Sequence, residues 1–589
     1  MKKTIILFLL FSGTKCISQI YFSPNAEMYV KNEVLYVGQN INLDANSNLY
    51  LRNNSQVVQG STGVSTNSGA GKLSVYQEGT TDNFDYNYWC SPVGNATASS
   101  GNENFGITML NRPTTSISST PATVLATNNS NGTSNPLAIA SKWIYKLINA
   151  NNYSQWIFVG GATTLAPGEG FSMKGTSGTD AVDPEGTGIN NNPGSSQRYD
   201  FRGKPNDGNI TITLGTNHTT LTGNPYPSAL DLNAFLLDPT NTATGSIAYF
   251  WEQDKTVNSH TLIDYKGGYA SYAPVDLVSS GVYVPATFNS YNGDGTLNTT
   301  GLSSGTIINR RYSPIGQGFV VNANANGTAT FKNSHRVFVK ESVGSSQFEK
   351  QTALKKEQNT KVSHFRLNTI INNQFTRQLA LAFVDQATDG IDTGIDALNM
   401  DTSLPNDVTF WLENSSYVIQ GVKFDETKKI PLAVKVTTNS KFKFYIPEVI
   451  NFDQSDNIYI YDALDESYHD IKNGTYEVTV APGNYYDRFM ITFKNQTLGT
   501  DENTIKTFLI VQDNTISSLK VSNPTMLEIK SFKLYDVLGR TVLSKKDLEK
   551  NQNYIFSTSG LTTGIYIAEF LTTDDTKFVE KIAISNTGN

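Results

Sequence analysis

Short apolar segments, each bounded by turn-forming residues, recur along almost the whole chain. Many alternate between apolar and polar positions, as residues 476–480 do, and others are dense in aromatic and β-branched residues, as residues 458–461 are. Half-buried strands have this two-residue period, whereas an amphipathic helix repeats every three to four residues over a longer run. The pattern predicts an all-β fold. Because 589 residues are too many for a single core, we expect several domains.

The amino-terminal segment is typical of a secretory signal peptide. Lys2 and Lys3 precede an apolar run over residues 5–11, and small or polar residues follow up to Gln19, where we expect cleavage. The apolar run is too short to span a bilayer, and we expect no transmembrane segment after it. Residues 1–19 are therefore expected to direct export and to be removed.

Net charge and cysteine content narrow the partners and the sources of stability. The formal net charge is -7 and no long basic block occurs, so we expect no nucleic-acid partner. Once the signal peptide is removed, Cys90 is the only cysteine and no disulfide can form within the chain. Because Cys90 follows Trp89 in an apolar segment, we interpret it as a small buried residue rather than a reactive thiol.

Residues 20–80 carry very short apolar segments at even spacing. Turn residues such as Gly38-Gln39-Asn40 and Asn46-Ser47-Asn48 separate them. This spacing fits either a few coils of a β-solenoid or a small meander that caps the next domain. The number of segments leaves both alternatives open, and we describe the region as a short β-repeat segment.

Residues 81–342 contain an internal duplication, with halves at about 84–175 and 199–340. Each half has a Pro-containing start, an aromatic hairpin and a Gly-x-Gly-Phe sequence, which ends in Phe171 and Phe319 respectively. Glycine permits a positive φ or a close backbone approach, and we expect each Phe to fill the core. A phosphate-binding loop would need a helix after the glycines, whereas strand-like residues follow here.

Three further segments complete the expected organisation. Residues 343–360 are polar and charged without alternation, which indicates a linker. Residues 361–497 contain strands at the spacing of a β-sandwich. Residues 505–589 contain seven short expected strands, the pattern of a small immunoglobulin-like β-sandwich. The expected architecture is thus all-β and multidomain.

Three blocks near the end of the chain resemble a known sorting domain. They are residues 532–540 (FKLYDVLGR), 559–568 (SGLTTGIYIA) and 581–584 (KIAI). In order and spacing they resemble the C-terminal sorting domain of type IX secretion cargo in Bacteroidetes. The commoner form of that domain opens with Pro-Asn-Pro, whereas this chain has Ser-Asn-Pro at residues 522–524, which indicates a less common subtype.

The resemblance implies that residues 505–589 are a sorting signal, which the type IX secretion translocon and its outer-membrane shuttle protein recognise. The protein would then be secreted or held on the extracellular face of the outer membrane. Strand alternation alone would equally fit a domain that only caps its neighbour, and the motif order and terminal position favour sorting. The positions that the resemblance marks are Tyr535, Asp536, Gly539, Arg540, Leu561, Gly564, Tyr566 and Lys581.

The body of the chain also resembles exported proteins. Blocks such as YWCSPV at residues 88–93 and GNPYPS at residues 223–228 resemble segments of large exported proteins of flavobacteria. That resemblance supports an extracellular location and implies no particular activity.

The sequence contains no recognisable catalytic constellation. None of the five His residues pairs with another at metal-ligand spacing, and the chain has neither a His-Glu-x-x-His nor a Gly-x-Ser-x-Gly sequence. We therefore expect a protein that is not an enzyme. The two carboxylates of a glycosidase can lie far apart in sequence, so a glycan hydrolase stays as an alternative.

One acidic cluster could hold a cation. Asp385, Asp389, Asp392 and Asp396 lie on a Gly-rich segment, and Ca²⁺ takes six to eight oxygen ligands of this kind. The competing interpretation is a turn whose Asp side chains cap backbone N–H groups. Calcium binding predicts a higher melting temperature when calcium is added.

Tryptophans offer a route to sugar binding, because an aromatic face stacks on a sugar ring. Trp143 and Trp156, on one expected hairpin, are the candidate pair, although burial is the ordinary fate of such residues. Taken together, we expect a structural or adhesive surface protein, an adhesin, whose partners beyond the translocon are surface glycans or other cell-surface proteins. A carbohydrate-binding module is the alternative function.

Overall fold

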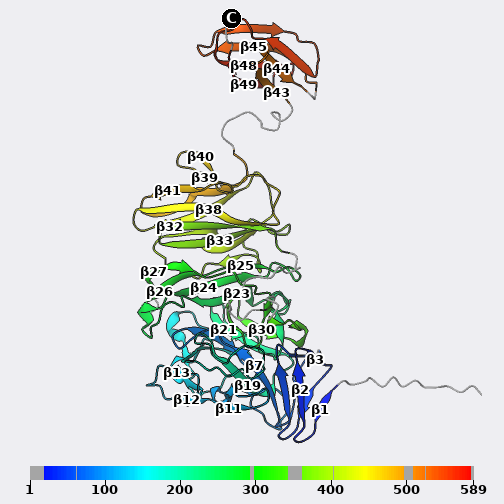
Figure 1. Cartoon of the computed structure of the whole chain (residues 1–589), viewed down its shortest axis with the longest axis vertical. Coiled ribbons are helices and arrows are strands. Elements are labelled where there is room, and N and C mark those ends of the chain that lie inside the picture. Colours follow the sequence, from blue (N-terminus) through cyan, green and yellow to red (C-terminus); the bar gives the residue numbers. More distant parts are fainter. Residues whose placement is uncertain are drawn as a thin grey trace, which may run out of the picture. The chain divides into compact units, whose positions relative to one another are not determined.

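The computed structural model describes residues 19–60, 63–291, 297–341, 346, 361–401, 404–495, 508–523 and 526–585. Residues 1–18 of the expected signal peptide and nearly all of the expected linker lie outside the described residues. Almost all regular structure is β, which confirms the all-β prediction (Figure 1). None of the helices in these ranges has the length and apolarity needed to cross a membrane. The chain divides into two compact units, residues 1–495 and 496–589.

Residues 20–59 form two coils of a parallel β-solenoid. The first coil has β1 (Ile20–Phe22), β2 (Glu27–Lys31) and β3 (Val34–Val37), and the second has β4 (Ile41–Leu43), β5 (Asn48–Arg52) and β6 (Gln56–Gln59). Each strand pairs in parallel with the strand one coil later: β1 with β4, β2 with β5 and β3 with β6. A meander would pair consecutive strands antiparallel, so the ladders identify the solenoid alternative.

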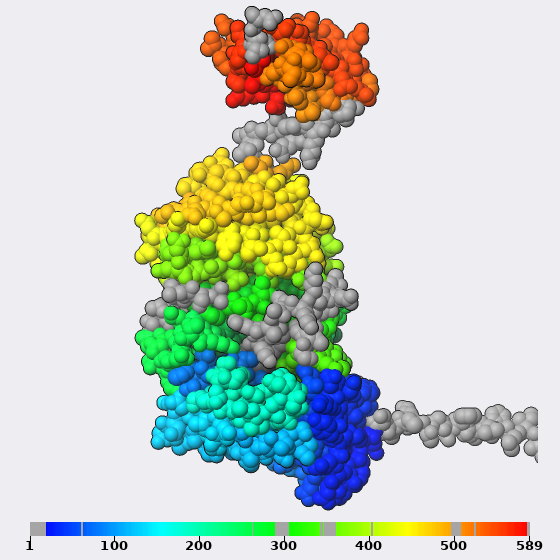
Figure 2. Space-filling model, in the orientation of Figure 1, coloured from blue at the N-terminus to red at the C-terminus, as the bar shows by residue number. Residues whose placement is uncertain are grey.

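The solenoid continues directly into the duplicated domain. β7 (Lys72–Glu78) pairs in parallel with β5 and antiparallel with β19 (Arg198–Pro205). Arg52 is buried at this junction, where it donates to the carbonyl of Ser74 at 2.8 Å and lies 3.6 Å above the Tyr76 ring. The solenoid surface accordingly borders the first half of the duplicated domain in Figure 2.

The two halves of the duplicated domain have the same strand order. The first runs β8 (Tyr86–Cys90), β17 (Gly170–Lys174), β15 (Tyr145–Lys146) and β16 (Ile157–Phe158). The second runs β21 (Thr219–Gly223), β29 (Gly318–Ala323), β23 (Thr244–Gln253) and β24 (Gly267–Ala273). In both, the strand that starts at the Gly-Phe pair lies between the opening strand and the hairpin, as expected for a duplication.

The remaining elements of this domain are short. Its only α-helix within the described ranges is α1 (Leu232–Leu236), capped by the Asp231 side chain. The 3₁₀ helices are η1 (Ile107–Met109), η2 (Ser141–Trp143), η3 (Tyr153–Gln155), η4 (Leu262–Asp264) and η5 (Asn333–His335). The other strands are β9 (Val93–Gly94), β10 (Leu110–Pro113), β11 (Ser119–Pro121), β12 (Thr123–Leu125), β13 (Gly132–Thr133), β14 (Ala138–Ala140), β18 (Thr176–Ser177), β20 (Ile210–Leu214), β22 (Ala229–Asp231), β25 (Val282–Val284), β26 (Thr287–Tyr291), β27 (Leu297–Ser304), β28 (Tyr312–Ser313), β30 (Gly327–Phe331) and β31 (Arg336–Val337).

The Gly-x-Gly-Phe turns have the structural role expected of them. Gly168 and Gly316 have φ angles of +84° and +76°. A Cβ on Gly170 would lie 2.7 Å from the carbonyl oxygen of Thr222, in the opening strand of the other half, and one on Gly318 would lie 2.6 Å from the carbonyl carbon of Tyr88. The Phe that follows each turn is fully buried. The turns therefore bring the two halves into backbone contact.

Substitution of Gly318 by Ala should destabilise the body of the protein. The added methyl group would meet backbone atoms of the strand β8, which cannot move aside without disturbing the sheet, so we expect a loss of about 1–3 kcal/mol in the free energy of unfolding. Gly106→Ala is the matched control, because the nearest atom to its Cβ would be 3.5 Å away. Denaturation followed by tryptophan fluorescence measures both, and equal losses would contradict the close-approach role.

Residues 361–495 form one eleven-stranded sheet that folds back on itself. Its order is β40 (Ser467–Asp470), β39 (Tyr459–Asp462), β42 (Gly483–Thr492), β37 (Lys429–Val436), β35 (Asp407–Leu412), β36 (Ser415–Val422), β33 (Phe375–Phe383), β32 (His364–Ile371), β38 (Ser440–Ile450) and β41 (Tyr476–Val480), with β34 (Ala397–Leu398) beside β36. Phe444 of β38 and Phe489 of β42, distant in this order, lie 5.9 Å apart across the core. This layering is that of a sandwich.

The core of this sheet continues into the duplicated domain. One cluster of buried side chains joins Phe365 and Leu381 of the sheet to Tyr249 and Val284 of the duplicated domain. Residues 361–495 therefore share their core with the preceding domain within one compact unit. Strand alternation shows which residues are buried, and it does not show against which element they pack.

The second unit is a small β-sandwich, in agreement with the strands expected for residues 505–589. One sheet has the order β43 (Leu509–Asp513), β44 (Ser518–Ser522), β47 (Asn553–Ser557), and the other β46 (Thr541–Lys546), β45 (Ile529–Asp536), β48 (Gly564–Thr572), β49 (Lys577–Ile584). Phe532, Phe556 and Phe570 stack between the sheets, with Phe532 4.3 Å from Phe556 and 4.4 Å from Phe570. The unit has a hydrophobic core of its own.

Candidate functional site

Three of the residues marked by the sorting-domain resemblance build the turn between β45 and β46. The Asp536 carboxylate accepts hydrogen bonds from the backbone N–H groups of Leu538 and Arg540, both at 3.0 Å, and from Nε of Arg540 at 2.7 Å. Hydrogen bonding to Arg540 lowers the pKa of Asp536. Gly539 supplies the positive φ of +77° that the turn requires. The tip exposes Val537 and Leu538, two apolar residues that sequence reasoning did not single out.

Three other marked residues organise the end of the unit where β48 begins. Leu561 packs against the core, and Gly564 is the first residue of β48. Tyr566 is buried, and its hydroxyl donates to the carbonyl oxygen of Thr562 at 2.9 Å. These residues shape the loop that enters the central strand.

Tyr535 and Lys581 lie on one outer rung of the same sheet. Tyr535 of β45 is in register with Ile567 of β48, which is in register with Lys581 of β49. Paired residues in antiparallel strands share a face, so a tyrosine and a lysine flank Ile567 on the outer side. The rung and the apolar turn tip are two surface features of this unit that a partner could contact. The roles of the marked residues in sorting stay predictions.

The four aspartates proposed for calcium occupy one turn region, but each has a separate role. The Asp392 carboxylate accepts from the Thr388 N–H at 2.6 Å, and Asp396 accepts from the N–H groups of Asp392 at 2.6 Å and Gly421 at 2.7 Å. Burial raises the pKa of Asp396 to about 7. Asp389 pairs with Lys428, and Asp385 is exposed.

These contacts are those of the turn-capping interpretation. Among the residues with described positions, no group of three or more His, Cys, Asp or Glu side chains is arranged to hold a metal ion. Calcium binding at this turn stays a prediction.

Calcium titration of the full chain separates the two interpretations. A bound ion would add oxygen contacts to the folded state only and raise the melting temperature at millimolar calcium, an increase that a chelator should reverse. Asp392→Asn keeps a side-chain oxygen for the caps and removes one charge, so it should abolish the increase. An unchanged melting temperature rejects the calcium site.

Trp143 and Trp156, the pair proposed for sugar stacking, have separate neighbours. The Trp143 indole donates to the carbonyl oxygen of Ser130 at 2.7 Å, and its ring stacks on His260 with centroids 5.3 Å apart. Trp156 packs against Tyr88 with centroids 5.9 Å apart. Both are half-buried. The faces of the two rings are largely occupied by protein contacts.

A buried lysine lies beside Trp143, where the two halves of the duplicated domain meet. Nζ of Lys174 lies 4.2 Å from the Trp143 ring centroid and 3.2 Å from Nδ1 of His260, and it contacts the Tyr265 hydroxyl. Burial lowers the pKa of Lys174 to about 7. Because Lys174 comes from the first half and its histidine and tyrosine partners from the second, the cluster connects the two halves.

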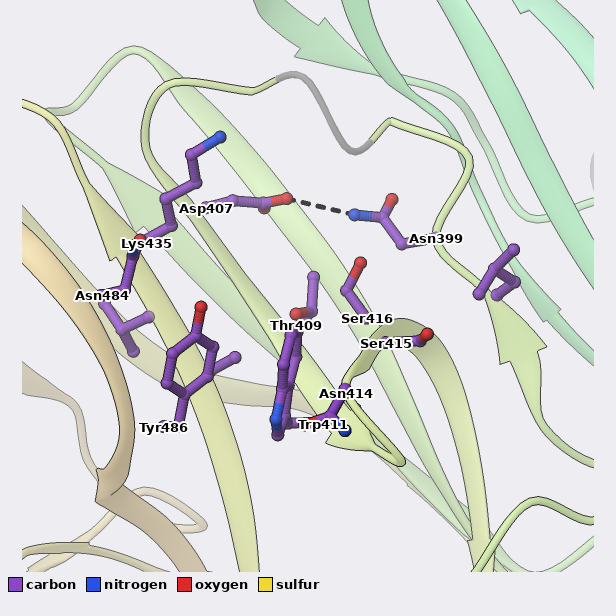
Figure 3. Close-up of a pocket in the computed structure, with 13 residues that line it drawn as sticks. Asn399, Asp407, Thr409, Trp411, Asn414, Ser415, Ser416, Lys435, Asn484 and Tyr486 are labelled. Atoms are coloured by element: carbon purple, nitrogen blue, oxygen red, sulfur yellow. Dashed lines mark hydrogen bonds between the residues drawn. The ribbon is translucent and has the colours of Figure 1, made fainter.

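A hollow of about 420 Å³ opens on the sheet of residues 361–495, over β36, β35, β37 and β42 (Figure 3). Its volume is in the range of ordinary ligand sites. Asp407, Thr409 and Trp411 alternate along β35 and face the hollow, while Val408 and Phe410 face the core. The residue opposite Thr409 on β37 is Ala433, whose small side chain leaves space at the floor.

An aromatic pair lies at one end of the hollow. The rings of Trp411 and Tyr486 have centroids 4.4 Å apart and an interplanar angle of 35°. Between β35 and β36, Glu413 and Asn414 both have positive φ, of 46° and 66°, as in a tight two-residue hairpin turn. This turn places Asn414 among the lining residues, close to the aromatic pair in Figure 3.

A buried ion pair supports the other end. Arg377 donates to both carboxylate oxygens of Asp407, at 2.7 and 2.8 Å, and lies 3.7 Å from Asp401. Nδ2 of Asn399 donates to Asp407 at 3.3 Å. The Asp407 carboxylate is thus neutralised and fixed, and it serves as a wall of the hollow.

Several polar side chains of the hollow are available to a ligand. Within the described ranges, five side chains that are at least partly exposed make no hydrogen bond or ion pair: Asn414, Ser415, Ser416, Lys435 and Asn484. Sequence reasoning missed this site. The sequence signal that could have indicated it is the strand of residues 407–411, in which two polar residues and a tryptophan alternate with apolar ones.

Comparison with known proteins identifies two matching family models. The model described as "Domain of unknown function (DUF8693)" matches residues 10–493, and the model described as "Secretion system C-terminal sorting domain" matches residues 513–585. The second match confirms the sorting-domain resemblance and indicates a type IX secretion substrate, as found in Bacteroidetes. No curated protein matches the chain.

Similarity to solved structures is low. The CupB2 chaperone of Pseudomonas aeruginosa is 11% identical, with 38% of this chain and 89% of that chain covered and a TM-score of 0.11. A biofilm-associated protein, its BSP domain, is 8% identical, with 88% of this chain and 96% of that chain covered and a TM-score of 0.12. Scores this low carry no argument about fold or function.

Proposed function

The chain belongs to the family described as "Domain of unknown function (DUF8693)" and carries a type IX sorting domain, and from this premise we propose that it is a non-enzymatic adhesive or structural protein of the cell surface. The sorting domain implies export and a surface or secreted location. The extracellular face of the outer membrane is the proposed place of action, and the translocon with its shuttle protein the proposed export partners.

The observation that carries the proposal is that buried aspartates in the body of the protein are paired with arginines. Catalytic carboxylates need an open partner and a substrate within reach. Four buried aspartates form ion pairs with arginines, as structural groups do: Asp180 with Arg112, Asp207 with Arg336, Asp407 with Arg377 and Asp462 with Arg488. The hollow contains one carboxylate, Asp407, and Arg377 neutralises it.

The experiment compares cells that lack the protein with complemented cells. Loss of the gene should reduce attachment of the cells to surfaces or to one another, and the wild-type gene should restore it. The purified protein should leave soluble polysaccharides intact in a reducing-sugar assay. Unchanged attachment, or turnover of a polysaccharide by the purified chain, would contradict the proposal.

A second candidate function is glycan binding, and the hollow favours it. The site combines an exposed aromatic ring, Tyr486, with uncharged amide and hydroxyl groups, a set that suits the faces and hydroxyls of a sugar. Glycan binding is compatible with adhesion, because a surface protein can adhere through a saccharide.

A further inference from the structure

We propose that the hollow over β35, β36, β37 and β42 binds an acidic saccharide, a glycan whose sugars carry carboxylates. The inference rests on the surface role proposed above, and it names the site and the chemical class of the ligand. Aromatic, polar and charged groups of the hollow each support one part of it.

Trp411 and Tyr486 give the hollow an apolar surface on which a sugar ring can pack. Tyr486 is 43% exposed and Trp411 is half-buried, so both residues are partly open to solvent. A sugar ring has one face lined with C–H groups, which packs on an aromatic ring while its hydroxyls point sideways. The aromatic end of the hollow fits that face of a sugar.

The polar groups suit a ligand that both donates and accepts hydrogen bonds. Asn414 and Asn484 each have two amide donors and one carbonyl acceptor, and Ser415 and Ser416 have hydroxyl groups. An apolar ligand would bury these groups without partners, at a cost in free energy. Sugar hydroxyls can pair with all of them.

Lys435 selects the acidic class. Lys435 of β37 lies directly opposite Asp407 of β35, yet it forms no ion pair within the described ranges. The Asp407 oxygens are occupied by Arg377, by Asn399 and by the Val408 N–H. The Lys435 ammonium is therefore free at the rim, where a carboxylate of the ligand would form a charge-assisted hydrogen bond.

Affinity gel electrophoresis of the chain spanning residues 20–589 tests the proposal. The gels contain alginate, polygalacturonate or hyaluronan, each run beside its carboxyl-reduced form. At least one acidic polymer should retard the protein, and its carboxyl-reduced form should bind about tenfold more weakly. Lys435→Met should remove that difference, and Trp411→Ala should weaken binding by about tenfold or more.

Two variants separate loss of the site from loss of folding. Ala433→Phe would fill the floor of the hollow without removing a side-chain contact, and it should abolish retardation in a protein that still unfolds in one cooperative transition. Tyr36→Ala removes an aromatic residue that is 64% exposed outside the hollow, and it should bind as the wild type does.

Three results would overturn the inference: no retardation by any acidic polymer, equal retardation by the reduced polymers, or wild-type binding by folded Trp411→Ala. A protein that binds no saccharide but is still needed for attachment would overturn this inference alone and leave the proposed surface function standing.

Discussion

Replacement of Arg377 by alanine should lower the free energy of unfolding of the body by about 3–5 kcal/mol. The guanidinium pairs with Asp407 through two hydrogen bonds of 2.7 and 2.8 Å and lies 3.7 Å from Asp401. Both aspartates are nearly inaccessible to solvent, at 6% and 4% exposure. Without Arg377, both buried carboxylates would lose the positive charge that balances them, which is the costly way to break a buried ion pair.

Denaturation followed by tryptophan fluorescence measures this loss in the body alone, because all five tryptophans precede residue 496. Lys428→Ala is the matched control. Its partner Asp389 is exposed at 78% of its side chain, and an exposed pair of this kind contributes about 1 kcal/mol or less. Similar losses in the two variants would contradict the supporting role of the buried pair.

Removal of residues 496–589 should abolish export across the outer membrane. This unit has its own hydrophobic core, and residues 1–495 form a separate compact unit. The truncated protein should therefore fold with an unchanged melting temperature, yet remain in the periplasm. Cell fractionation and immunoblotting measure the distribution, and truncated protein in the medium at wild-type amounts would contradict the sorting role.

Local features of the fold followed from the sequence because their causes are local. The glycines of the Gly-x-Gly-Phe turns were expected to permit a positive φ or a close approach, and Gly168 and Gly318 show one each. The turn that contains Asp536 and Gly539 is likewise held by hydrogen bonds within a few residues. Such features need no knowledge of distant parts of the chain.

Features that depend on strand pairing did not follow from the sequence. The solenoid and the meander share the same short apolar segments, and only the parallel pairing of β2 with β5 separates them. Trp411 and Tyr486 lie on β35 and β42, the two strands on either side of β37, and their rings meet over that strand. Strand alternation does not encode this strand order. Trp143 and Trp156 were proposed as a sugar-stacking pair because they are close in sequence. In the structure they pack against different neighbours, which closeness in sequence does not predict.

The surface role of the protein depends first on its export. The most direct measurement fuses residues 505–589 to a reporter that carries a signal peptide and follows the reporter in cells with and without a working type IX secretion system. The account predicts that the reporter reaches the medium or the cell surface only when the secretion system works. A reporter that stays in the periplasm of wild-type cells, or that leaves cells lacking the system equally well, would contradict it.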